Sequence, residues 1–136
     1  MRIQVLDVGA GNAIVIDQVI PGGLIGSHCG PNDGWKANVH GAQAYGNRTR
    51  AIPPSCVPGS DLGINKAKAQ DKTAKLKGVS FQAQSKGATY PTFVGPLRMT
   101  IVLGGAAEAA GGQCAHRSFL PGECGPSGKN YKCKQF

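Results

Sequence analysis

Glycine and proline interrupt this chain too often for long helices to form. The 136 residues contain 21 glycines and 9 prolines, nearly twice the share that these two residues have in average proteins. The segments between them are short and rich in valine and isoleucine, which favour extended backbone. The sequence therefore predicts short strands joined by turns rather than a helical bundle.

Runs that alternate polar and apolar residues mark the expected strands. They cover residues 2–8, 13–20, 64–69, 73–84, 97–103, 114–120 and 130–134, with two shorter pieces at 35–39 and 42–45. Turn signals at nearly every junction are typical of an antiparallel β-sandwich or small barrel of about eight short strands. We expect one all-β domain spanning residues 1–136, stapled by disulfides, with a loop-rich segment at about residues 22–63.

The clearest alternation lies at residues 97–103. Leu97, Met99, Ile101 and Leu103 occupy one face of the expected strand, and more polar residues occupy the other. Because side chains of a strand point alternately to its two faces, the apolar set predicts core positions in a central strand.

Residues 73–84 alternate less regularly. The parity of the apolar positions changes between Leu76 and Val79. A β-bulge at residues 77–78 would keep both apolar sets on one face. We therefore expect a single bulged strand here.

The segment VLDVGAG, from Val5 to Gly11, resembles the glycine-rich first motif of the Rossmann-like S-adenosylmethionine-dependent methyltransferases. The resemblance implies a helix after the glycines and a cofactor against their backbone. Residues 13–20 are instead β-branched, and Pro21 ends them. We interpret Gly9 and Gly11 as part of a hairpin turn, and we expect no cofactor.

Five cysteines indicate disulfide bonds, and with them an oxidising compartment. No C-x-x-C motif and no histidine pair with the spacing of zinc ligands is present, so we expect no structural metal. The odd count leaves one thiol after two bridges. Short loops favour a Cys29–Cys56 bridge and a second bridge within the trio Cys114, Cys124 and Cys133, although spacing alone does not fix the pairing.

The chain carries a net charge of +8, which favours an anionic partner. Its densest basic run places Lys66 and Lys68 on one face of an expected strand, and Lys75 and Lys77 on one face of the next. Adjacent strands would join these four lysines into a basic patch for an acidic polysaccharide or another anionic surface. The alternative is a solvated face, or a sheet edge that lysine protects. Nucleic acid is disfavoured, because no aromatic residues alternate with the lysines to stack bases.

Two features of the loop-rich segment suggest surface roles. Trp35 lies in a turn-rich loop, where its ring could stack on a sugar or could instead close the end of the β domain. Asn47-Arg48-Thr49 fits the N-glycosylation sequon, which marks exposed asparagines in secreted eukaryotic proteins.

We expect an extracellular or cell-surface module that has a binding or structural role and is not an enzyme. Its partner would be an anionic polymer or further copies of the chain. One alternative is a small secreted hydrolase with its site in residues 22–63, where His28, His40 and Asp33 are the local acid–base candidates. Another is a structural subunit of a capsid or filament.

The sequence also bears on membranes and export. No apolar run reaches the roughly 18 residues of a membrane-spanning helix, so we expect no membrane span. The N-terminal segment lacks the charged-then-apolar order of a signal peptide. For an extracellular protein, we therefore expect the export signal to have been removed or to lie outside this sequence.

Overall fold

The computed structural model describes residues 1–76, 78–90, 95–104, 106–127 and 130–133. Within them the chain forms strands β1 (Arg2–Asp7), β2 (Ala13–Val19), β3 (Gly34–Ala37), β4 (Gln43–Gly46), β5 (Ile64–Asp71), β6 (Val79–Ser85), β7 (Leu97–Val102), β8 (Cys114–Phe119), β9 (Cys124–Ser127) and β10 (Asn130–Cys133). The described helices are the short α1 (Thr73–Leu76) and α2 (Ala106–Ala110), with 3-10 turns η1 (Val8–Ala10) and η2 (Pro121–Glu123). The predicted all-β fold class is confirmed, because the described strands form two antiparallel four-stranded sheets and one two-stranded sheet.

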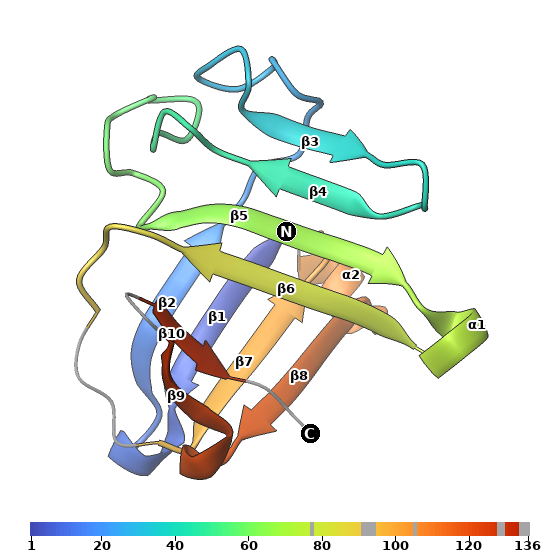
Figure 1. The fold of residues 1–136 in the computed structure, drawn as a ribbon. Coiled ribbons are helices and arrows are strands. Elements are labelled where there is room, and N and C mark those ends of the chain that lie inside the picture. The colour runs from blue at the N-terminus through green and yellow to red at the C-terminus, as the bar shows by residue number, and fades with distance from the viewer. Residues whose placement is uncertain (77, 91–94, 105, 128–129, 134–136) are drawn as a thin grey trace. The chain divides into compact units, whose positions relative to one another are not determined.

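The chain forms two compact units, and the second interrupts the sequence of the first. The first unit comprises Met1–Ile20 and Thr89–Phe136, and the inserted unit comprises Pro21–Ala88. Figure 1 shows the sheet β2-β1-β7-β8 of the first unit and the sheet β3-β4-β5-β6 of the inserted unit. The loop-rich segment that the sequence predicted lies in the inserted unit.

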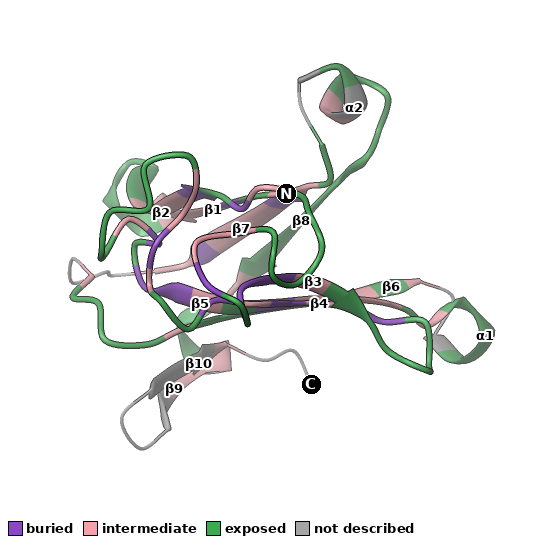
Figure 2. Cartoon of the chain, turned by 90° about the horizontal axis from the view of Figure 1, so that it is seen from above, coloured by how far each residue is buried: buried purple, intermediate pink, exposed green. Residues whose placement is uncertain are grey.

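Strand β7 lies between β1 and β8, so the predicted central strand is confirmed. Ile101 pairs with Ile3 across the sheet, and these side chains are 4% and 1% exposed. Leu97, on the same face, is also buried. Figure 2 shows the contrast with β8, which is exposed over most of its length.

Two of the predicted core positions differ from expectation. Met99 shares the face of Ile101 but is only half-buried. Leu103 is exposed, so its predicted core position is wrong. The strand ends at Val102, and the alternation of faces cannot continue beyond that point.

The glycines between β1 and β2 serve the hairpin, as we interpreted them. The carboxylate of Asp7 accepts a hydrogen bond of 2.9 Å from the backbone nitrogen of Gly95. The segments around Gly9 and Gly95 lie so close together that a Cβ on Gly9 would be 1.9 Å from the carbonyl oxygen of Gly95. Gly11 follows with a φ of +67°, a conformation that glycine adopts at little cost.

The expected bulged strand at residues 73–84 is wrong in its first part. Residues Thr73–Leu76 form helix α1, and β6 begins only at Val79. The Asp71 carboxylate accepts a 2.7 Å hydrogen bond from the backbone nitrogen of Thr73, a local contact that favours a turn over an extended chain. The change of parity therefore reflects a helical turn between β5 and β6.

The disulfide predictions are confirmed. Cys29 is bonded to Cys56 within the inserted unit, and Cys124 is bonded to Cys133 across the β9–β10 pair. Cys114 is exposed and forms no disulfide. Strand β9 was not expected, since the sequence around Cys124 carries the glycine and proline of a loop.

None of the helices in the described part of the chain has the length and hydropathy that crossing a membrane would need.

We predict that Ile101→Ala lowers the free energy of unfolding by about 2 to 5 kcal/mol, because it leaves a cavity beside the buried side chain of Ile3. Arg98→Ala and Thr100→Ala, on the opposite face of the same strand, should cost much less. Urea titrations of the three variants provide the measurement. A larger loss for either polar variant would contradict the face assignment.

We predict a single reactive thiol in the native protein, that of Cys114, and no more after denaturation without reductant. A thiol titration counts it, and a non-reducing peptide map should recover two bridged peptide pairs. Five thiols in the unreduced, denatured protein would overturn both disulfides.

Candidate anion-binding pocket

A pocket of about 550 Å³ opens on one face of the inserted sheet. Strand pairing aligns Gly34, Gly46 and Lys66 in one row of this face, and Lys36 and Ala44 with Lys68 in the next. The small residues on β3 and β4 leave the surface hollow between the lysines of β3 and β5. The pocket is thus a consequence of the small side chains on β3 and β4.

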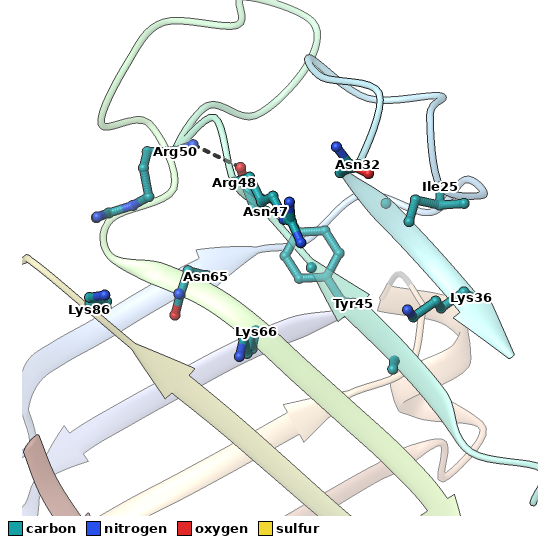
Figure 3. A pocket seen from close by; sticks show the side chains of 13 residues that line it. Ile25, Asn32, Lys36, Tyr45, Asn47, Arg48, Arg50, Asn65, Lys66 and Lys86 are labelled. Carbon is teal, nitrogen blue, oxygen red and sulfur yellow. Dashed lines mark hydrogen bonds between the residues drawn. The ribbon is translucent and has the colours of Figure 1, made fainter. Parts of the chain in front are cut away.

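The charged residues of the lining are all basic. Thirteen residues line the pocket, of which five are basic and none is acidic. The basic residues are Lys36, Arg48, Arg50, Lys66 and Lys86. Figure 3 shows Arg50 and Lys86 towards one end of the pocket, Lys36 and Ile25 towards the other, and Lys66 between them. We call this site the basic pocket.

Asn47 organises the turn that carries the two arginines. Its side-chain nitrogen donates to the hydroxyl of Tyr45 at 3.0 Å and to the carbonyl oxygen of Ala51 at 2.9 Å. Its side-chain oxygen accepts from the backbone nitrogen of Arg50 at 2.9 Å. Asn47 is 3% exposed, so it is not presented to solvent as the sequon reading requires.

Asp33 holds the same turn from the other side. Its carboxylate is fully buried and accepts a 2.6 Å hydrogen bond from the backbone nitrogen of Arg48. The hydroxyl of Thr49 donates to the second oxygen of this carboxylate. The backbone of Arg48 is therefore fixed, while its side chain is exposed at the basic pocket.

Asp61 compensates part of the positive charge. Its fully buried carboxylate pairs with Nε of Arg50 at 2.5 Å and accepts from the backbone nitrogen of Gly63 at 3.0 Å. The two salt bridges of the described residues join Arg2 to Asp17 and Arg50 to Asp61. The other four cations of the basic pocket therefore have no acidic partner within the described ranges.

The lysine patch takes a different form from the predicted one. Lys66 lines the basic pocket, and Lys68 shares its face without lining the pocket. Lys75 lies on helix α1 and not on a strand beside them, so the predicted four-lysine arrangement is wrong at this position. Lys77 lies outside the described residues.

Four of the five basic residues of the pocket were not among the binding residues expected from the sequence: Lys36, Arg48, Arg50 and Lys86. The strands that contain or precede them were expected, but their order in the sheet was not. Pairing of residues 42–45 between 35–39 and 64–69 would have placed Lys36 near Lys66. No local signal marks Lys86, which is positioned by the 2.8 Å bond from its backbone nitrogen to the carbonyl oxygen of Gly63.

Trp35 lies away from the lysines. Its register partner is Tyr45, on the face opposite Lys36 and Lys66. The two rings pack at a centroid distance of 5.4 Å, and the indole nitrogen donates to the carbonyl oxygen of Pro21 at 2.9 Å. The half-buried Trp35 therefore has a structural role in packing, and the structure does not join it to the basic pocket.

The acid–base candidates of the hydrolase alternative are not assembled. The Asp33 carboxylate binds the turn described above, and Nε2 of His28 lies 2.9 Å from the carbonyl oxygen of Gly22. No hydrogen bond in the described ranges joins His28, His40 and Asp33 to one another. Nor does the described chain bring together three His, Cys, Asp or Glu side chains that could hold a metal ion.

The chain matches no protein-family model, no curated protein and no solved structure.

Burial raises the pKa of the Tyr45 phenol above its ordinary value of 10.0, with the hydrogen bond from Asn47 acting in the opposite direction. The unfolded chain then loses this proton at a lower pH than the folded one. The contribution of the neutral phenol to the free energy of unfolding is fully present below pH 10, and it is lost as the pH rises through the folded-state pKa.

We therefore predict that the melting temperature falls more steeply between pH 9 and 11 in the wild-type protein than in Tyr45→Phe. Lysine titration is common to both proteins and cancels in the comparison. Parallel pH profiles would contradict a buried, neutral phenol.

Proposed function

We propose that this protein is an extracellular, non-catalytic binding module that takes a segment of an anionic polymer in the basic pocket. The single observation that carries the proposal is a hollow lined by five cations and by no acidic side chain. A charged lining around a concavity combines attraction with shape, which a uniformly basic surface does not.

The spacing of the cations favours an extended ligand. Lys36 on β3 and Lys66 on β5 are separated by strand β4, and two strand spacings are about 10 Å. This separation is close to the screening length of about 8 Å at physiological salt, so the potentials of the two lysines overlap. Lys86 and Arg50 extend the basic lining beyond Lys66. A polymer with repeated charges can contact several of these cations at once.

The two disulfides support the proposed extracellular location. Cys29–Cys56 and Cys124–Cys133 are bonds that oxidising environments maintain and that the reducing cytosol opposes. An extracellular module would also encounter acidic polysaccharides, which carry sulfate or carboxylate groups at regular intervals. The charge of +8 would speed encounter with such a polymer.

We predict that Lys36→Gln, Lys66→Gln and Lys86→Gln together shift elution from heparin to much lower salt. A matched control replaces Lys72, Lys75 and Arg117 by Gln, which removes the same charge from residues that do not line the basic pocket. The control should elute close to the wild-type protein. Because both triple variants have the same net charge, the comparison separates location from bulk charge.

Equal shifts for the two triple variants would overturn the proposal, since binding would then depend on net charge alone. Melting temperatures of both variants should stay near that of the wild-type protein, because none of the replaced residues forms a salt bridge within the described residues.

A further inference from the structure

We infer that strand β6 is the contact between two copies of this chain, which pair edge to edge into one continuous antiparallel sheet. The inference goes beyond the proposed function, because it concerns the edge of the inserted sheet and not the basic pocket. Its basis is a sheet edge that lacks the charge or proline with which proteins usually keep such an edge from pairing.

Strand β6 is the last strand of the inserted sheet and pairs with β5 on one side (Figure 1). The described strands provide no partner for its other side. Its sequence is VSFQAQS, which contains no charged residue, no proline and no glycine. The other edge strands of the two four-stranded sheets each carry a charged residue: Asp17 on β2, Lys36 on β3 and Arg117 on β8. Among these edges, β6 therefore opposes pairing with another strand least.

The ends of β6 show which of its backbone groups face outwards. The carbonyl oxygen of Gly78 accepts a 2.9 Å hydrogen bond from the backbone nitrogen of Lys72, which follows β5. The backbone nitrogen of Lys86 donates at 2.8 Å to the carbonyl oxygen of Gly63, which precedes β5. Because backbone N–H and C=O groups alternate in direction from one residue to the next, the even-numbered residues of β6 point towards β5. The N–H and C=O groups of residues 79, 81, 83 and 85 therefore point away from β5.

Only one pairing of β6 with its own copy satisfies all of these outward groups. Outward residues must face outward residues, so the two-fold axis passes through a residue and not between two residues. With the axis at Gln82, the middle of the strand, Val79 faces Ser85 of the second copy and Phe81 faces Ala83 of the second copy. Any other position of the axis leaves outward groups of one strand end beyond the end of the other strand.

The apolar side chains of β6 are complementary in this register. Val79, Phe81 and Ala83 share one face of the strand, and Val79 is 54% exposed. In the pair, each Phe81 ring faces the small Ala83 of the second copy. The two Phe81 rings become diagonal neighbours at about 7 to 8 Å, a separation that aromatic side chains bridge. Pairing thus buries apolar surface that β6 exposes in the single chain.

The positive charge of the chain acts against association, but it is weak at this edge. Gln82 pairs with Lys68 on β5, so Lys68 lies three strand spacings, about 14 Å, from its counterpart in the second copy. This separation exceeds the screening length of about 8 Å at physiological salt. Two chains of charge +8 repel each other less as salt is raised. Association should therefore strengthen with salt, whereas heparin binding should weaken.

A two-fold axis perpendicular to the sheet places equivalent faces of the two copies on the same side. Both basic pockets then lie on one face of the continuous sheet, with the paired β6 strands between them. A long anionic polymer can contact both pockets at once, which raises its affinity without any new contact. This consequence rests on the proposed function, whereas the pairing itself does not.

The test is a cysteine scan of β6 in the full chain, in which Cys114→Ser first removes the exposed thiol. Gln82→Cys places two thiols opposite each other at the axis. The Cα atoms of such a non-hydrogen-bonded pair are about 4.5 Å apart, which is within the range of disulfides. Mild oxidation should therefore convert this variant to a covalent dimer.

Ser80→Cys and Gln84→Cys are the matched controls on the same face of β6. Each alone should stay monomeric on oxidation, because in this register residue 80 faces residue 84 of the second copy. A mixture of the two variants should form the covalent dimer. Equal cross-linking of all three single variants, or no cross-linking of Gln82→Cys, would overturn the inference.

A second variant, Ala83→Pro, tests the pairing without new thiols. The N–H of Ala83 points outwards, so proline removes a donor to the second copy and none to β5. The symmetric pair loses this hydrogen bond twice, and sedimentation equilibrium should show a dissociation constant raised at least tenfold. Ala83→Ser keeps the N–H and should associate like the wild-type protein. Equal association of Ala83→Pro and the wild-type protein would contradict pairing through β6.

Heparin binding separates this inference from the proposed function. Ala83→Pro should weaken binding of long heparin about tenfold and leave a heparin disaccharide unaffected, because the disaccharide is too short to reach two pockets. Unchanged binding of long heparin would show that the two pockets do not act together. The cross-linking pattern needs no heparin. If that pattern is found but heparin binds the wild-type protein and the Lys36, Lys66 and Lys86 triple variant equally, the proposed function fails and the pairing stands.

Discussion

The buried carboxylate of Asp33 joins two turns of the inserted unit that flank the paired ends of β3 and β4. It accepts hydrogen bonds from the backbone nitrogen of Arg48 and from the hydroxyl of Thr49, while its own backbone is tied to the carbonyl oxygen of Gly30. A buried carboxylate is costly unless such donors surround it. Asp33 therefore stabilises this arrangement of the turns strongly, and the position of the arginine-bearing turn depends on it. Loss of this contact would release the turn that carries Arg48 and Arg50.

The two faces of the inserted sheet differ in burial and in charge. Tyr45 and Ala67 are buried on one face, where Trp35 packs against Tyr45. The other face carries small residues on β4 between lysines of β3 and β5. Crowded positive charges repel each other, and the pairing of Arg50 with the buried Asp61 offsets one of them. The other four basic residues of the pocket have no acidic partner within the described residues.

Much of the fold could be predicted from local pattern. Alternation identified β1, β2, β5 and β7, and short loops favoured the two disulfides that the structure contains. Prediction failed at α1, where the side chain of Asp71 closes a turn within an alternating run, and at β9, where pairing with β10 outweighs a loop-like composition. In both places a contact specific to this chain outweighs average residue preference.

The sequence by itself determined which side chains share a face within one strand, because the period of two is a property of the backbone. It thereby placed Lys66 and Lys68 opposite Ala67. Only the tertiary structure decided that Lys36 and Lys86 join Lys66 around a hollow floored by glycine. Strand order and the paths of turns depend on contacts between residues far apart in the chain. Those contacts have no local signature, so the basic pocket emerges only when the strands are brought together.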